Sequence, residues 1–292
     1  PDGSYSFEDY LDDDGAGTED ILIRATVTIE DDSATVDFSG SAPQVAGCVN
    51  AVLAITVSCV FYVFRCLAPE VMPSNAGCLK PIRIQAPERS VVNAEAPAAV
   101  VGGNVETSQR IVDVLFGALA AALEGKIPAA SCGSMNNVSI GGYDQFRKKP
   151  FTYYETLAGG MGARPLKDGL DGVHTHMTNT KNTPIEVIEN VYPLKIRRYA
   201  FRAGSGGSGK HRGGDGLLRE YEILGEADMS ILSERRRRAP YGMAGGESGA
   251  RGENWLRRDS NWQLVPPKVN VQGSPGNCFR IMTPGGGGYG RA

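Results

Sequence analysis

The clearest pattern near the start of the chain is an alternation of apolar and polar side chains. Apolar residues occupy every second position of residues 21–29, and Arg24, Thr26 and Thr28 lie between them. Because successive side chains of a strand point to opposite faces, this alternation predicts a half-buried β-strand. A polar turn at residues 31–33 and an apolar run at residues 34–38 predict a second strand, which completes a hairpin.

Two helices are predicted by apolar patterns of a different kind. Residues 51–64 are almost entirely apolar, but a membrane span needs about 20 such residues, so we expect a buried core helix that ends before Pro69 and no membrane association. In residues 111–123 apolar side chains recur at helical spacing. Asn104 or Thr107 could cap this second helix, or the two preceding glycines could admit an anion to its amides; the ordinary capped helix is favoured.

The rest of the chain predicts one short helix and several short strands. The helix has Thr183 as its cap, Pro184 at its first position and an end before Pro193. We expect strands at residues 82–84, 151–155, 194–201, 217–224, 229–232, 269–271 and 279–282.

The fold class is therefore α+β, with mixed sheets, a few buried helices and a mostly antiparallel C-terminal third. We expect residues 1–195 to form an α/β region that holds the hairpin, two buried helices and a loop with two histidines. Residues 196–292 should form a β-rich region with a glycine-rich tail.

Charge and cysteine content narrow the functional classes. The net charge of −3 over 292 residues, with mixed signs, provides no overall field for nucleic acid. The arginine run at residues 235–238 lacks interleaved aromatic residues, which favours a solvated or ion-paired face, or a partner contact, over nucleic acid. The six cysteines form no Cys-x-x-Cys pair, so we expect free thiols in a reducing cytoplasm and no zinc site.

Glycine is abundant, with 38 residues, and several loops depend on it. Residues 204–211 nearly form a P-loop, but His211 stands where magnesium binding needs Ser or Thr, so a flexible turn between strands is favoured over phosphate binding. The four glycines at 285–288 are typical of a mobile tail, or would allow close packing against a ligand or partner. The acidic residues at 12–15 indicate a solvated turn in preference to a calcium loop.

The strongest candidate for chemistry is the segment at residues 168–180, which we call the histidine loop. It holds two of the chain's three histidines, His174 and His176, together with short hydrogen-bonding side chains and glycine. Imidazole titrates near neutral pH, so the loop could move protons or bind a metal, or both rings could simply tie the loop to its neighbours. In a strand the two rings would share a face.

Other loops carry side chains that could converge with the histidine loop on one pocket. The catalytic candidates are His174, His176 and Glu155, and the substrate-binding candidates are Asn104, Glu106, Asn136, Asn137 and Arg164. Each of these side chains could instead support its own loop, and the sequence assigns no metal ligand.

Several of these segments resemble the hydantoinase B/oxoprolinase family, and the resemblance extends over essentially the whole chain. They are DFSGSAPQ at 37–44, NVETSQR at 104–110, YYET at 153–156, GGMGAR at 159–164, DGLDGVHTHMTN at 168–179, SERRR at 233–237 and TPGGGGYG at 283–290.

The resemblance implies ATP-dependent opening of a cyclic amide, as in N-methylhydantoinase or 5-oxoprolinase. Sister members are ATP-dependent ketone carboxylases of the acetone and acetophenone type. In the family this B-type subunit works with an A-type subunit that carries the ATP site, so we expect a cytoplasmic hetero-oligomer. A non-catalytic assembly module for the A-type subunit is the alternative from another functional class.

This sequence departs from the family in length, because it matches only the C-terminal portion of the B-type subunit. The chain opens with Pro-Asp-Gly inside a polar stretch, which indicates a piece of something longer. The family's upstream portion carries the Asp and His motifs associated with a divalent metal, such as Mg, Mn or Zn. We therefore expect the metal to be bound mainly by that missing segment, which could be a separate chain.

The implied reaction suggests roles for the candidate residues. Phosphorylation of the lactam oxygen would create a leaving group, and water would attack the imidate-like carbon. Such chemistry needs a proton acceptor and hydrogen-bond donors for the developing charge. His174 and His176 could be the base or orient it, Glu155 and Glu106 could orient water or a histidine, and Arg164 could hold a carboxylate or phosphate. Asn104, Asn136 and Asn137 could donate hydrogen bonds.

Overall fold

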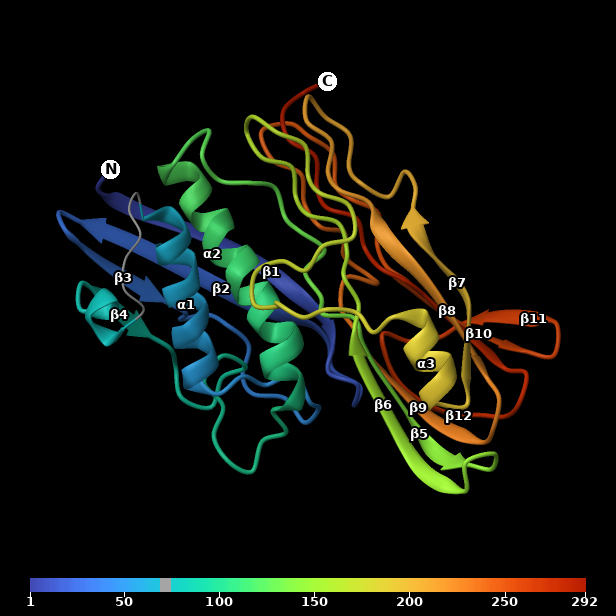
Figure 1. The fold of residues 1–292 in the computed structure, drawn as a ribbon. Coiled ribbons are helices and arrows are strands. Elements are labelled where there is room, and N and C mark those ends of the chain that lie inside the picture. Colours follow the sequence, from blue (N-terminus) through green and yellow to red (C-terminus); the bar gives the residue numbers. More distant parts are fainter. Residues whose placement is uncertain (69–74) are drawn as a thin grey trace. The chain divides into compact units, whose positions relative to one another are not determined.

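The computed structural model describes residues 1–68 and 75–292 (Figure 1). It divides into two compact units, Pro1–Pro128 and Ala129–Ala292. The predicted boundary between residues 195 and 196 lies within the second unit. The end of the apolar run before Pro69 borders residues 69–74, which lie outside the described residues.

The first unit is built on a four-stranded sheet with the order β1-β2-β3-β4. Its strands are β1 (Gly3–Asp13), β2 (Glu19–Glu30), β3 (Ser33–Asp37) and β4 (Ile82–Gln85). The predicted hairpin is confirmed as β2 and β3, whereas β1 was not predicted because acidic residues follow its short aromatic alternation. The pairing of β1 with β2 places a third antiparallel strand beside the hairpin, and β4 joins β3 in parallel.

Two helices, α1 (Leu53–Leu67) and α2 (Ser108–Ala122), pack side by side on this sheet (Figure 1). Both predicted helices are therefore confirmed. Helix α1 buries only one stripe, which includes Cys59 and Val63, while Leu53 at its start is 43% exposed. A short 3₁₀ turn, η1 (Ala76–Leu79), precedes β4.

The start of α2 differs from the prediction. A turn of π-helix, η2 (Gly103–Thr107), precedes α2, and no side chain caps either element. The hydroxyl of Thr107 donates instead to the carbonyl of Val49. A methyl group added to Gly103 would lie 2.1 Å from the carbonyl oxygen of Asn50, so this glycine is needed for backbone packing. The predicted cap is thus wrong, and the glycine turn that could have admitted an anion is occupied by the chain itself.

Two of the three aspartates in the predicted acidic turn at residues 12–15 are buried. Asp12 and Asp14 are 0% and 1% exposed, and the carboxylate of Asp14 accepts hydrogen bonds from the amides of Ala16, Thr18 and Gly47 at 2.7–2.9 Å. Burial would raise the pKa of Asp14, but these hydrogen bonds outweigh it and lower the pKa. The expectation of a solvated turn is therefore wrong, because the carboxylate organises the backbone around it.

The second unit contains two antiparallel sheets that share one hydrophobic core. Their strand orders are β11-β10-β13-β8-β7 and β12-β9-β5-β6. The core residues include Val138, Tyr153, Tyr221 and Phe279, which come from strands of both sheets. The strands are β5 (Asn137–Asp144), β6 (Lys149–Thr156), β7 (Leu194–Arg202), β8 (Gly216–Ile223), β9 (Ala227–Leu232), β10 (Glu253–Arg258), β11 (Asn261–Leu264), β12 (Lys268–Gly273) and β13 (Cys278–Met282).

These elements confirm the α+β class and the antiparallel character of the C-terminal third. The strands β5, β10 and β11 were not predicted. The short helix is present as α3 (Ile185–Val191), but Thr183 does not cap it. The amide of Thr183 instead donates to the carboxylate of Glu155 at 2.8 Å, so the segment before α3 is held by tertiary contacts.

Glycine-rich segments of the second unit form a closely packed assembly, which we call the glycine layer. It comprises residues 159–162, 204–214, 242–249 and 285–288. The amide of Gly286 donates to the carbonyl of Gly214, and the amide of Gly207 donates to the carbonyl of Gly286, each at 2.9 Å. A methyl group added to Gly285 would lie 1.9 Å from the carbonyl oxygen of Ser205. The expected flexible turn and mobile tail are therefore wrong, because these glycines pack against the chain's own backbone.

Candidate functional site

The histidine loop is held in place by its two aspartates. The carboxylate of Asp168 accepts a hydrogen bond from the amide of Arg212 at 2.9 Å. The carboxylate of Asp171 accepts from the amide of Asp215 at 2.7 Å and from the Arg212 guanidinium at 3.0 Å. These contacts fix the start of the loop against residues 211–215, so its acidic residues act as anchors.

His174 belongs to a short hydrogen-bonded chain of side chains. Its Nε2 lies 3.3 Å from Oγ1 of Thr180, and that hydroxyl lies 2.5 Å from Oγ1 of Thr156 at the end of β6. The imidazole is partly buried, and this loss of solvent lowers its pKa, while the nearby charge of Glu155 acts in the opposite direction. The neutral form of the ring is therefore favoured at pH 7, and the contact with Thr180 orients it.

His176 does not stand in a strand with His174. Residue 176 has a positive φ of 56° and lies in a turn. The two imidazoles are thus not related by strand alternation, and the expectation that they would share one strand face does not hold for this turn. The side chain of His176 is partly buried.

Glu155 is held by three neighbouring groups. Its Oε2 accepts a hydrogen bond from the hydroxyl of Tyr221 at 2.9 Å and lies 3.2 Å from Nη1 of Arg219, while its Oε1 accepts from the amide of Thr183. Burial, followed by the charge of Glu155, raises the pKa of Tyr221 well above its ordinary value. The Tyr221 phenol is therefore a constant hydrogen-bond donor to this carboxylate.

Because side chains alternate along β6, Glu155 and its neighbour Thr156 point to opposite faces of the sheet. Glu155 and Tyr153 face the core between the two sheets, whereas Tyr154 is 57% exposed. Thr156, like Tyr154, points to the outer face of the sheet. The loop after His174 wraps around the edge strand β6, with Thr180 bonded on the outer side and Thr183 on the inner side.

Asn137 lies on the same outer face as Thr156, since the two residues are directly paired across β5 and β6. Its Oδ1 accepts a hydrogen bond from the hydroxyl of Tyr154 at 2.6 Å. We call the group formed by these side chains the histidine face; it comprises His174, Thr180, Thr156, Asn137 and Tyr154.

Asn136 is directed away from solvent and is almost fully buried. Its backbone has a positive φ of 48°, and its amide nitrogen donates to the carbonyls of Ser134 and Leu157. Its Oδ1 accepts a hydrogen bond from Arg236 at 2.6 Å. These contacts use the side chain to join β5 with the segment after β9.

The remaining candidates lie in other parts of the molecule. The guanidinium of Arg164 donates to the backbone carbonyl of Asp168 at 3.0 Å and so supports the start of the histidine loop. Asn104 and Glu106 belong to η2 in the first unit, where Asn104 is exposed and Glu106 is fully buried. Their convergence with the histidine face stays a prediction.

Sequence reasoning missed the residues that position His174 and Glu155. A signal existed for Arg219 and Tyr221, which alternate with Leu217 and Ile223 along one buried face of β8, because a charged residue on a buried strand face needs a partner. No comparable signal marks Thr156 and Thr180, because isolated threonines are common and their contact depends on how the loop wraps around β6.

Metal-binding side chains do not gather within residues 1–68 and 75–292. In these ranges no three His, Cys, Asp or Glu residues are grouped so that they could hold a metal ion. None of the helices among the described residues combines the length and apolar character needed to cross a bilayer.

A core between two antiparallel sheets, a glycine layer and a histidine beside a sheet edge together define a two-sheet α+β protein. The sequence profile of one family, described as Hydantoinase B/oxoprolinase, matches residues 1–292. The chain belongs to this family.

Relatives with assigned names support this placement. The chain is 43% identical to 5-oxoprolinase 1 of Arabidopsis thaliana over 284 residues, which cover 97% of this chain and 21% of the relative. It is 33% identical to the putative B-type subunit of a D-/L-hydantoinase of Pseudomonas sp. (strain NS671), covering 99% of this chain and 51% of the relative. The chain thus spans from about a fifth to about half of the length of these relatives.

Two solved structures have a similar fold. The ATP-dependent caprolactamase from Pseudomonas jessenii superimposes with a TM-score of 0.87 at 26% identity, over 100% of this chain and 52% of that chain. Acetone carboxylase in its nucleotide-free structure superimposes with a TM-score of 0.85 at 18% identity, over 99% of this chain and 45% of that chain. The second likeness describes the fold alone.

Proposed function

We propose that this chain is the C-terminal part of the B subunit of an ATP-dependent cyclic amide hydrolase. The observation that carries the proposal is the family match over residues 1–292, together with relatives named as a 5-oxoprolinase and as the B-type subunit of a hydantoinase. The substrate class is a small lactam or cyclic imide such as 5-oxoproline or N-methylhydantoin. The reaction is ring opening through a phosphorylated intermediate, with ATP bound on an A-type partner subunit in a cytoplasmic hetero-oligomer.

The proposed role of His174 is to accept the proton of the attacking water. Its lowered pKa supports this role, because a base must be neutral at the working pH. With the proton on Nε2 donated to Thr180, the lone pair of Nδ1 becomes the acceptor. Thr156 fixes Thr180 in turn, so the ring is oriented before substrate binds.

Glu155 would act on this base through its charge. The carboxylate counteracts the effect of burial on His174 and would stabilise the imidazolium that forms when the ring accepts a proton. His176 would assist as a second base or as an orienting group. Asn104, Glu106, Asn136, Asn137 and Arg164 remain the predicted substrate-binding residues.

A divalent metal, Mg, Mn or Zn, belongs to the proposal for the complete enzyme, but the described residues of this chain do not form a site that fits one. We infer that its ligands come mainly from the upstream portion of the B subunit. No step of the proposed mechanism is assigned to the metal. Its contribution would be to polarise the substrate oxygen or the attacking water.

The experiment is ring opening by the complete B subunit with its A-type partner, ATP and Mg²⁺, using 5-oxoproline and N-methylhydantoin in parallel. His174→Ala and His176→Ala are compared with Thr152→Val, an exposed β6 position that belongs to none of the proposed groups. Loss of turnover in the histidine variants alone supports the proposal. Full ring-opening activity in both histidine variants would support a non-catalytic assembly role for this chain.

A ketone carboxylase subunit is the second candidate, supported by the fold shared with acetone carboxylase. Bicarbonate distinguishes the two reactions, because carboxylation consumes it and hydrolysis does not. Turnover of acetone or acetophenone that requires bicarbonate and ATP, without ring opening of either cyclic amide, would replace the first proposal with this one.

A further inference from the structure

The surface of the first unit carries a group of apolar side chains at the end where both of its helices, α1 and α2, begin (Figure 1). Two segments form this group, residues 52–54 and residues 96–101. Every residue in the two segments is apolar, and all except Ala98 are exposed. The side chain of Val101 is 70% exposed. We call these two segments the apolar patch.

Backbone hydrogen bonds bring the two segments of the apolar patch together. The amide of Ala94 donates to the carbonyl of Ala51 at 3.0 Å, and the amide of Gly102 donates to the carbonyl of Cys48 at 2.7 Å. The second segment lies between these two bonds, and the first segment follows directly after Ala51 at the start of α1. The chain therefore presents both segments in one region of the surface.

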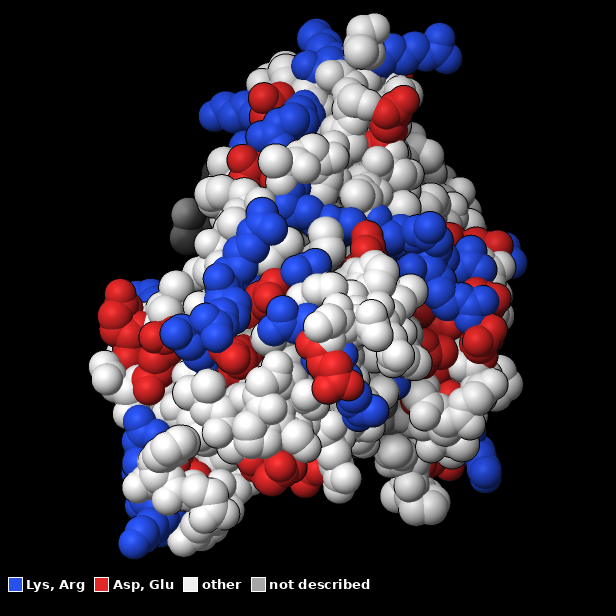
Figure 2. Space-filling view, turned by 90° about the vertical axis from the view of Figure 1, so that its right-hand side faces the viewer, with Lys and Arg blue, Asp and Glu red and all other residues white. Residues whose placement is uncertain are grey.

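A patch of this kind is unusual on the surface of a folded chain. Single exposed valines and leucines are common, whereas consecutive exposed apolar residues indicate contact with another surface. Neither segment of the apolar patch contains a charged residue. The face shown in Figure 2, by contrast, carries basic and acidic side chains close to one another. The patch thus has the composition of a buried contact.

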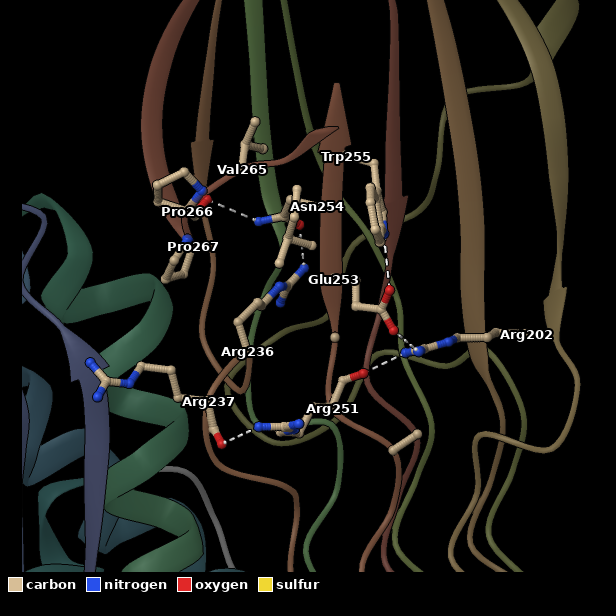
Figure 3. Close-up of a pocket in the computed structure, with 13 residues that line it drawn as sticks. Arg202, Arg236, Arg237, Arg251, Glu253, Asn254, Trp255, Val265, Pro266 and Pro267 are labelled. Carbon is tan, nitrogen blue, oxygen red and sulfur yellow. Dashed lines mark hydrogen bonds and ion pairs between the residues drawn. The ribbon is translucent and has the colours of Figure 1, made fainter. Parts of the chain in front are cut away.

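A cavity in the second unit has a different character (Figure 3). Its volume is about 800 Å³, and charged groups in its lining bond to one another. Arg202 pairs with Glu253 at 2.6 Å, and Glu253 also accepts a hydrogen bond from the indole of Trp255 at 2.9 Å. These contacts join β7 and β10 within the second unit, so the charges of this pair are compensated by the unit itself.

The length of related proteins indicates what covers the apolar patch. The chain superimposes over its whole length on the caprolactamase, yet it covers only 52% of that chain. It likewise covers 51% of the hydantoinase subunit. In both relatives, about half of the polypeptide lies outside the part that matches this chain. Such a second half can bury an apolar surface without a separate partner.

The composition of the apolar patch also favours a permanent contact. Interfaces that stay joined are more apolar, and resemble a core cut in half, whereas interfaces between subunits that separate are about as polar as the rest of the surface. A partner that dissociates would leave the patch exposed to water and prone to association. Two segments without a single charged residue therefore fit a contact within one polypeptide.

We propose that the apolar patch is covered by the upstream portion of the B subunit. This inference rests on the proposed function, which assigns such a portion to the B subunit. Leu53 and Val101 would contact it directly. Asn104 is exposed and lies one turn after Val101, so this predicted substrate-binding residue would stand at the border between the two portions.

The test is photochemical cross-linking in the complete B subunit. In separate proteins, Val101 and Phe146 are replaced by the photo-reactive residue benzoylphenylalanine, and mass spectrometry identifies the linked peptides. We expect position 101 to link to the upstream portion. Position 146 is the matched control, because Phe146 is an apolar side chain of similar exposure, 76%, in the second unit. Equal links to the upstream portion from both positions would indicate non-specific reaction and overturn the proposal.

Other linked peptides would identify a different occupant. Links from position 101 to residues 129–292 would show that the second unit covers the apolar patch. Mixing proteins of normal and heavy isotopic mass separates links within one molecule from links to a second copy. A link that forms only after the A-type subunit is added would assign the patch to that partner. Each of these results, or no link under any condition, overturns the proposal.

Hydrogen exchange tests the same contact without a bulky residue. Val101→Asp would place a charge in an apolar contact, where the loss of its hydration opposes burial. We expect the amides of residues 99–101 to exchange at least about tenfold faster in this variant of the complete B subunit than in the parent. Leu264→Asp, at an exposed position of the second unit, should leave these rates unchanged. Equal rates in the parent and in Val101→Asp would contradict the contact.

Ring opening is measured separately on the parent protein with its A-type partner. A parent that forms the expected link but opens neither cyclic amide would refute the proposed function and leave the contact in place. A parent that opens the ring, while position 101 gives no link to the upstream portion, would refute the contact alone.

Discussion

Glu155 on β6 and Arg219 on β8 form an ion pair that joins the two sheets of the second unit. The 3.2 Å contact is buried, with side chains that are 3% and 0% exposed. Arg219 also donates to the carbonyl of Thr183 and lies 4.4 Å from the ring centre of Tyr199. The pair therefore ties together both sheets and the segment that follows the histidine loop.

Removing one partner of this pair should destabilise the protein strongly. A buried charge left without its partner costs about 3–5 kcal/mol, so Arg219→Leu should lower the free energy of unfolding by about 3 kcal/mol or more. Denaturant unfolding measures the change. Arg197→Leu is the control, because its pair with Glu222 is 45% exposed on the arginine side and should contribute at most about 1 kcal/mol. Similar losses in the two variants would contradict the structural role of the Glu155 pair.

The stability of the fold should depend on pH through His174. Its pKa is lowered below the ordinary value of 6.5, so protons bind more tightly to the unfolded chain. The neutral ring's contribution is complete above pH 6.5 and is lost as the pH falls from 6.5 towards the folded pKa. Unfolding measured between pH 8 and pH 5 should therefore show a smaller acid-side loss in His174→Gln than in the parent. Parallel curves for the two proteins would contradict a lowered pKa.

Thr180 should act as a positioning residue for His174. Thr180→Val keeps the side-chain shape and removes the hydroxyl that lies 3.3 Å from Nε2. We expect kcat for ring opening to fall by about tenfold, with KM changed by less than about twofold, because the ring loses its orientation and substrate contacts remain. Steady-state kinetics across pH should show a changed profile for the base. Thr152→Val, on the same face of β6, should leave both constants and the profile unchanged.

A methyl group added at Gly285 should destabilise the glycine layer. In Gly285→Ala the new atom would lie 1.9 Å from the carbonyl oxygen of Ser205, and the nearest atoms belong to backbone, which cannot yield as a flexible side chain can. We expect a loss of about 2 kcal/mol or more in unfolding free energy. Gly141→Ala is the control, since its new atom would meet ordinary contacts at 3.5 Å or more. A Gly285→Ala protein as stable as the Gly141→Ala protein would show that the layer is loosely packed.

Side-chain periodicity predicted those helices and strands that can be recognised without knowing what they pack against. The alternation in β2 and the helical spacing of α2 indicate elements that bury apolar side chains, whatever they pack against. Strand β1 was not predicted, and the predicted helix caps were wrong. Thr183 illustrates the reason, because a local rule assigned it as a cap while the distant carboxylate of Glu155 took its amide.

The packing of the glycine-rich segments could not be predicted from local sequence. Residues 204–211 and 285–288 resemble flexible loops by composition, since glycine permits many conformations. In the folded chain the same lack of a side chain allows backbone segments far apart in sequence to approach and exchange hydrogen bonds. Composition alone does not reveal which of these two properties is used.

The sequence by itself determined the α+β class, the principal helices and strands, and the family. These follow from side-chain periodicity and from motifs that can be recognised along the chain. Only the tertiary structure decided that Glu155 faces the core and that Thr156 and Thr180 orient His174. Such relationships depend on contacts between residues distant in sequence, where strand pairing and loop wrapping, rather than local preference, set which groups meet.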